Sequence, residues 1–200
     1  NKGSNLSSLR SLIDQKSANE LKNKASKNKR GFTFISQINN SKFKNFYFFN
    51  INEKMIDHEY QDLGGLIVSE ALSLKKDKIE ILFDTLPKQI KNNKSIIQNI
   101  LVGILSKNYS FSNYKQKDQS KKIANVNLVC SNKNFVKQAL KYAESINAGV
   151  TETRNLVTTP PNILNPVNFV NQVKKLKKFG LKIEILDEAK LKKIGMNALL

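Results

Sequence analysis

Two adjacent prolines, Pro160 and Pro161, constrain the fold of this 200-residue chain more than any other feature. Proline has no amide hydrogen and disfavours helical geometry in the residue before it, so no helix can pass through this point. Asn165 and Pro166 follow, a pair typical of a helix N-cap with proline at the first helical position. The sequence therefore predicts a break near residue 160 and a new helix from Pro166. The local chemistry alone indicates an interdomain connection.

Strand-like and helix-like segments alternate before the prolines. Period-two or continuous apolar runs predict strands at residues 31–35, 45–51, 78–83 and 125–130. Helical apolar spacing predicts helices at residues 6–13 and 57–74, from Ser95, and from Asn134 towards the prolines. This alternation predicts an α/β domain in which helices cover a mostly parallel or mixed sheet.

Local signals refine two of these helices. Asp57 and Asn134 are the expected caps of the helices that follow them. Gly64 and Gly65 lie inside the helix at 57–74, where each costs about 1 kcal/mol relative to alanine. We therefore expect the two glycines to allow close packing of this helix onto the sheet.

A second α/β pattern begins after the prolines. The expected helix at 166–179 ends at Gly180, a strand follows at 181–186, and Asp187 caps a further helix that Gly195 ends. Residues 196–200 are expected to begin another strand. A folded domain rarely ends on such a strand, so we expect the natural chain to continue.

The reactive side chains do not assemble into a recognisable active site. Asp57, Glu59 and Asp62 are close in sequence but lie at a helix start, whereas a two-metal centre needs converging carboxylates. His58 has no partner His, Cys or paired carboxylate nearby in the sequence. Cys130 is the only cysteine, so no disulfide can form within the chain and no Cys/His metal spacing exists. No residue is assigned a catalytic, cofactor-binding or metal-binding role.

The charge leaves one class of partner open. The formal net charge is +18, a value that ordinarily suggests binding to nucleic acid or to an anionic membrane. The positive charge is almost entirely lysine, whereas phosphate-binding surfaces favour arginine forks. A general compositional bias is therefore the first interpretation, and nucleic-acid binding is the alternative. No apolar run is long enough for a membrane span, and the lone cysteine fits a reducing cytoplasm.

Several motifs together follow the pattern of one enzyme family. Residues 154–162, Arg-Asn-Leu-Val-Thr-Thr-Pro-Pro-Asn, resemble the signature that joins the two domains of the leucyl (cytosol) aminopeptidases. Thr158 departs from it, because the family usually has asparagine there. Further matches are Asp62, Leu63, Gly64 and Gly65; Gly103, Tyr109, Phe111, Tyr114 and Lys115; and Gly195, Met196, Ala198, Leu199 and Leu200. The agreement extends from about residue 45 to the end of the chain.

The resemblance implies a fold and an activity. Residues 1–132 would form an N-terminal macro-domain-like α/β domain with a mixed sheet flanked by helices, 133–157 a linker helix, and 158–200 the first α-β-α elements of a truncated α/β metallopeptidase domain. Members of the family are cytoplasmic hexamers that release N-terminal amino acids from peptides with two Zn or Mn ions. Their metal ligands and catalytic residues lie beyond the segment that matches 195–200, so none is carried over to this chain.

Two other functions stay open at this point. Nucleic-acid binding is motivated by the net charge of +18 and occurs among some bacterial members of the family. Binding of a nucleotide sugar by the macro-domain-like part would suit the expected fold. The sequence lacks the spaced glycines of a phosphate-binding loop, however, and this weakens the second of these alternatives.

Overall fold

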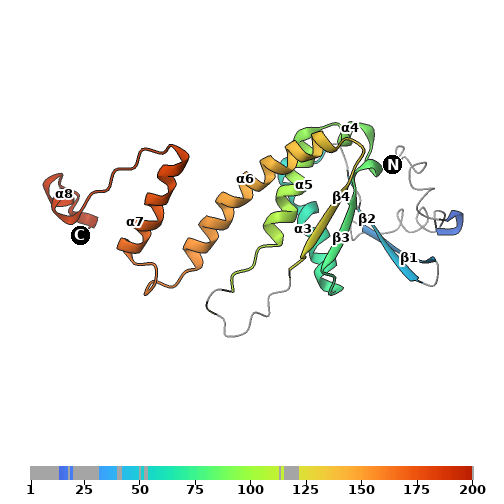
Figure 1. The fold of residues 1–200 in the computed structure, drawn as a ribbon, viewed down its shortest axis with the longest axis horizontal. Helices are drawn as coiled ribbons and strands as arrows, with labels where there is room; N and C mark the ends of the chain where they lie inside the picture. Colours follow the sequence, from blue (N-terminus) through green and yellow to red (C-terminus); the bar gives the residue numbers. More distant parts are fainter. Residues whose placement is uncertain are drawn as a thin grey trace. The chain divides into compact units, whose positions relative to one another are not determined.

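The structure is a computed structural model that describes residues 14–17, 19, 32–39, 42–49, 51, 54–112, 114 and 122–199 (Figure 1). The described part is a mixed α/β structure with more helix than strand. The predicted helix at 6–13, Gly31, Lys115 and Leu200 lie outside the described residues.

The first two strands form an antiparallel pair. β1 (Phe32–Asn39) pairs antiparallel with β2 (Lys42–Phe49), in a register that sets Phe32 opposite Phe49 and Asn39 opposite Lys42. The predicted strands at 31–35 and 45–51 overlap β1 and β2, but the observed limits of both strands differ from the predicted ones. Phe49 is half-buried and packs against the core.

A parallel pair forms the second sheet. β3 (Lys78–Leu82) and β4 (Asn125–Val129) pair with Leu82 opposite Val129, and Figure 1 shows them side by side. Parallel neighbours need a long crossover, which here includes η1 (Phe83–Thr85), α4 (Lys88–Lys91) and α5 (Lys94–Lys107). Both strands are confirmed. The expectation of one mixed sheet is not met, because the described strands form two separate two-stranded sheets.

Two glycines bring helices α3 (Asp57–Ser73) and α5 into backbone contact. A Cβ on Gly64 would overlap the carbonyl oxygen of Ile100 and would lie 3.1 Å from Cα of Gly103. A Cβ on Gly103 would likewise overlap the carbonyl group of Gln61. The predicted close packing at Gly64 is therefore present, but its partner is α5 and not the sheet. Gly65 has no such role, since a Cβ there would meet only Cβ of Lys107 at 3.9 Å.

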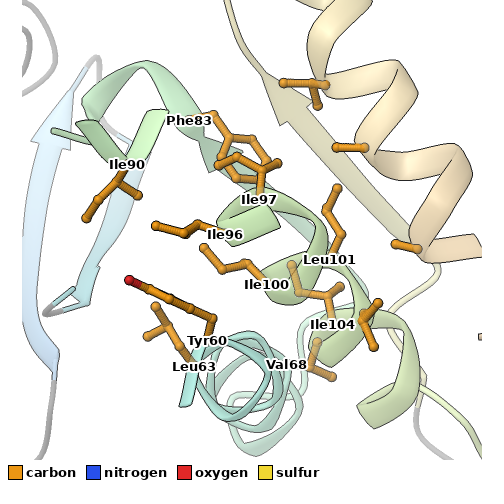
Figure 2. Close-up of a cluster of buried hydrophobic side chains, with 14 of the residues drawn as sticks. Tyr60, Leu63, Val68, Phe83, Ile90, Ile96, Ile97, Ile100, Leu101 and Ile104 are labelled. Atoms are coloured by element: carbon orange, nitrogen blue, oxygen red, sulfur yellow. The ribbon is translucent and has the colours of Figure 1, made fainter. Parts of the chain in front are cut away.

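The core lies on both sides of α5. Figure 2 shows Ile96 and Ile100 of α5 facing Tyr60 and Leu63 of α3, while Ile97 lies beside Phe83. The buried residues of this core are Tyr60, Leu63, Val68, Ala71, Phe83, Ile90, Ile96, Ile97, Ile100, Leu101, Val102, Ile104, Ile123, Val136, Ala139 and Ala143. Because α5 is apolar on opposite faces, it can pack against α3 on one side and meet the strand layer on the other.

Two helix caps, those of α3 and of α6 (Lys133–Thr158), differ from those predicted. The amide N–H of Ile56 donates to the carboxylate of Glu59 at 2.8 Å, so Ile56 is the cap and Asp57 is already helical. Asn93 caps α5 by accepting from the amides of Ser95 and Ile96. The side chain of Asn132 accepts from the amide of Phe135 at 3.1 Å, so Asn132 caps the long helix in place of Asn134. An asparagine two positions earlier in the chain therefore has the capping role.

The long helix ends where the prolines require. α6 (Lys133–Thr158) stops before Pro160, and α7 (Pro166–Lys174) begins after it. Asn165 caps α7 by accepting from the amide of Asn168 at 2.9 Å. Both predictions are confirmed. Among the apolar residues of α6, Val136, Ala139 and Ala143 are buried, Leu140 and Val150 are half-buried, and Ile146 is exposed.

The segment after the prolines is helical. η2 (Lys175–Phe179) continues α7 and ends at Gly180, whose φ of +84° favours glycine. α8 (Glu188–Lys193) is capped by Asp187, as predicted. The predicted strand at 181–186 is wrong. A strand needs a neighbouring strand to pair with, and the described residues in 152–199 contain no strand. The predicted strand at 196–200 is also wrong, since η3 (Asn197–Leu199) occupies it.

The chain divides into two compact units between Thr151 and Glu152, a point inside α6. The three-part division at 1–132, 133–157 and 158–200 stays a prediction. Within the described ranges, no helix has both the length and the apolar character that a membrane crossing requires.

The glycine contact yields a stability prediction. Gly64→Ala is expected to destabilise the protein by about 2 kcal/mol or more, because the added methyl group overlaps backbone atoms that a side-chain rotation cannot move aside. The measurement is urea-induced unfolding followed by circular dichroism.

Two matched controls make the same chemical change elsewhere. Gly65→Ala adds a methyl group at ordinary contact distance, and Gly149→Ala adds one on α6 with no atom within 4 Å of it. Both are expected to be neutral or to stabilise by up to about 1 kcal/mol, since alanine favours helix more than glycine does. Equal effects of all three substitutions would contradict the proposed role of Gly64.

Candidate functional site

The acidic residues considered in the sequence do not converge. Asp57, Glu59 and Asp62 are exposed on the first turns of α3, and Glu59 serves the helix start. His58 is exposed on the same helix. Among the described residues, no group of three or more His, Cys, Asp or Glu side chains could hold a metal ion.

A pocket of about 270 Å³ lies instead at the carboxyl ends of β3 and β4. It is lined by Phe83, Asp84, Lys91, Asn92, Ile97, Cys130, Asn132, Phe135 and Val136. Since β3 and β4 are parallel and end in register, the residues that follow them reach the same edge of the sheet. This edge is where ligands bind in open α/β sheets. The pocket is therefore the candidate functional site.

Polar residues lie within three positions of the end of each strand. Phe83 and Asp84 follow β3, and Cys130, Ser131 and Asn132 follow β4. The hydroxyl of Ser131 donates to Oδ2 of Asp84 at 2.7 Å, which ties the two strand ends together. This hydrogen bond joins residues 47 positions apart in the chain.

An ion pair sets the charge of the pocket. Nζ of Lys91 lies 2.8 Å from Oδ1 of Asp84, and each side chain is about one-third exposed, at 34% and 33%. The hydrogen bond from Lys91 is the largest cause that lowers the pKa of Asp84, from 3.8 to about 2, and the hydrogen bond from Ser131 is the next. The carboxylate is therefore ionised at neutral pH, and this pair presents one negative and one positive group side by side.

The chemistry of the pocket favours binding over catalysis. A carboxylate with a pKa of about 2 is a poor general base at neutral pH, because the best catalytic pKa lies near the working pH. Cys130 lines the pocket, but no histidine does, so the base that would activate a thiol is missing from the lining. The remaining walls are mainly apolar. This combination of apolar walls and few polar groups is typical of small-molecule sites.

Sequence reasoning did not identify this pocket. Asp84 and Lys91 are close in the chain, but Asn132 follows β4, and the parallel pairing of β3 and β4 brings it to the same pocket. The available signal was polar residues directly after two predicted strands. That signal is informative only when the two strands are known to be neighbours.

The ion pair generates a titration prediction. Lys91→Met is expected to raise the pKa of Asp84 from about 2 towards 3.8, and Ser131→Ala should raise it less. The readout is the ¹³Cγ shift of Asp84 in an NMR titration. Because the folded pKa is depressed, the ion pair contributes stability above about pH 4 and loses it as the pH falls towards 2.

Lys94→Met is the matched control for this titration. The ammonium of Lys94 donates to Gln138 at 3.1 Å, so this variant removes an equal charge without touching Asp84. An Asp84 pKa that is the same in the Lys91 variant and the control would contradict the assigned cause.

Comparison with known proteins relates this chain to part of one enzyme family. Residues 151–200 match a family model described as the catalytic domain of the cytosol aminopeptidase family. The chain is 37% identical over 149 residues to a protein of Phytoplasma mali named "Probable cytosol aminopeptidase", a match that covers 72% of this chain and 29% of that protein. A protein of the same name from Agrobacterium fabrum is 35% identical over 152 residues, which cover 74% of this chain and 30% of its own length.

A solved structure agrees at the level of fold. A mutant of tomato leucine aminopeptidase matches with a TM-score of 0.67 and 17% identity, over 96% of this chain and 39% of the tomato chain. The chain spans less than one-third of the two curated relatives described above. We conclude that it is related to the cytosol aminopeptidases over part of their length, with residues 151–200 matching the catalytic domain of that family.

Proposed function

We propose that this chain is the N-terminal part of a cytoplasmic leucyl aminopeptidase, a two-metal exopeptidase that releases N-terminal amino acids from peptides. Residues 1–132 would be a macro-domain-like domain, 133–157 the linker helix and 158–200 the beginning of the catalytic domain. The match of residues 151–200 to the catalytic domain of the family carries the proposal. The complete enzyme would be a homo-hexamer.

The surface of the second unit supports this proposal. Among residues 152–199, Val157, Val167 and Phe179 are 82%, 69% and 70% exposed, and other large apolar side chains there are also exposed. Exposed apolar groups in this number are typical of a surface that another part of a protein covers. The proposed cover is the remainder of the catalytic domain.

The described residues of this chain do not fit a two-metal centre, because they contain no cluster of three metal-binding side chains. The proposal therefore places the two divalent ions, Zn or Mn, in the part of the enzyme outside this chain. In the complete enzyme this segment would serve assembly and regulation. No catalytic step is derived for it.

An activity assay tests the proposal. The 200-residue chain alone should not hydrolyse a leucyl amide, whereas the protein extended through the whole catalytic domain should do so with added Mn or Zn. Chelation with EDTA should abolish that activity, and restoring the metal should recover it. A folded, hexameric and metal-loaded extended protein that hydrolyses no aminoacyl amide would contradict the proposal.

Nucleic-acid binding is a second candidate function that one specific surface favours. Lys174, Lys175, Lys177 and Lys178 are all exposed within a few residues of each other. Nζ of Lys178 lies 4.9 Å from the ring centroid of the exposed Phe179. Lysines beside an exposed aromatic ring are suited to bind the backbone and stack on the bases of a single strand.

Salt dependence tests this second candidate. If the lysines contact phosphates, the affinity for a fluorescent oligonucleotide should fall steeply between 50 and 200 mM salt, as counterions are released. The double variant Lys177→Gln, Lys178→Gln should reduce the log–log slope by about 1.4 for a single strand. The control Lys75→Gln, Lys76→Gln removes two other exposed charges and should leave the slope nearly unchanged. An oligonucleotide affinity that does not change with salt concentration would contradict this function.

A further inference from the structure

The pocket at the ends of β3 and β4 has no role in the function proposed above. It lies in the first unit, outside the segment that matches the catalytic domain. The side chains of Asp84 and Lys91 are each about one-third exposed, but Oδ1 of Asp84 is buried, so a ligand would have to approach this carboxylate at Oδ2. The pocket therefore requires an explanation of its own.

Both charged groups keep bonding capacity beyond their mutual contact. The Asp84 carboxylate has about four lone-pair sites, and it accepts from Lys91, from the hydroxyl of Ser131 and from the backbone of Ser131, so one site stays open. The Lys91 ammonium has three N–H donors, of which the contact with Asp84 needs one. A ligand can therefore donate to Asp84 and accept from Lys91 while the ion pair stays intact. Such a ligand carries a positive group and a negative group close together.

The first turn of α6 reinforces the positive side of the pocket. Asn132, Phe135 and Val136 line the pocket, and they lie at the N-terminal end of a 26-residue helix. The N-terminus of a helix carries a partial positive charge that favours an anionic group nearby. Together with Lys91 it suits a carboxylate.

The apolar walls and the volume define the rest of the ligand. Phe83 and Ile97 are buried, Phe135 and Cys130 are half-buried, and all four line the pocket. The volume of about 270 Å³ is just below the range of about 300–1,000 Å³ that drug-sized ligands occupy. The ligand is therefore small and partly apolar, and it is smaller than a nucleotide sugar.

We propose that this pocket binds a free apolar α-amino acid of about the size of leucine. The ammonium would donate to Asp84, the carboxylate would accept from Lys91 beside the start of α6, and the side chain would lie against Phe83 and Phe135. This inference does not depend on the aminopeptidase function, since it concerns only binding by the first unit. If both hold, the enzyme binds its own product class outside its catalytic domain.

Calorimetric titration of the 200-residue chain with L-leucine tests the proposal. The expected dissociation constant is on the order of 1 mM, a weak affinity that suits so few ligand atoms. Leucinamide lacks the carboxylate, 4-methylpentanoate lacks the ammonium and glycine lacks the apolar side chain, so each should bind about tenfold more weakly or worse. ADP-ribose should not bind. Equal affinity for leucine and 4-methylpentanoate, or tighter binding of ADP-ribose, would overturn the proposal.

Variants locate the binding site. Asp84→Asn and Lys91→Met should each weaken leucine binding about tenfold or more, because each removes a charge-assisted hydrogen bond. Glu188→Gln is the matched control, since it breaks a comparable exposed ion pair with Lys192 (2.7 Å) in the second unit. It should leave the affinity within about twofold. Equal affinity in all three variants would place any leucine site elsewhere and overturn the proposal.

Cys130 gives a readout that needs no substitution. It is the only cysteine in the chain and lines the pocket, so its alkylation rate by a maleimide reports access to this site. Saturating L-leucine should slow alkylation at least about fivefold, and glycine at the same concentration should not. Unchanged alkylation under conditions where leucine binds would overturn the assignment, even if a variant failed to fold.

Discussion

The contact between Gly64 and Gly103 is the constraint on which the first unit depends. Neither position can hold a Cβ, because each faces backbone atoms of the opposite helix. The helices α3 and α5 therefore lie closer than side chains would otherwise allow. Ile96 and Ile100 of α5 face Tyr60 and Leu63 of α3 in the space between the two helices (Figure 2). α5 also belongs to the crossover between β3 and β4, so the glycine contact supports the sheet edge where the pocket lies.

Sequence reasoning succeeded where the determinant is local. The prolines at 160 and 161 end α6 through their own chemistry, and Asn165 caps α7 through residues three positions away. The strands at 78–82 and 125–129 follow from short apolar patterns that need no knowledge of the fold. These features are encoded within one turn of helix or one strand.

The errors occur where a distant partner decides the outcome. Residues 181–186 have a strand-like pattern, but a strand forms only against a neighbour, and the described part of the second unit supplies none. Gly64 was expected to pack on the sheet, yet its partner is a helix about forty positions later in the chain. The pocket was missed for the same reason, since Asp84 and Ser131 meet only after β3 and β4 pair. Asn134 was expected to cap α6, but Asn132 does so, because its side chain accepts from the amide of Phe135.

The ion pair at the end of β3 has a consequence for how the pocket can respond to its surroundings. Asp84 remains ionised far below any acidity that a living cell reaches, and Lys91 is its positive partner. This carboxylate is therefore not a pH switch at neutral or mildly acidic pH. Mild acidification would therefore not remove the negative charge that a ligand meets at Asp84.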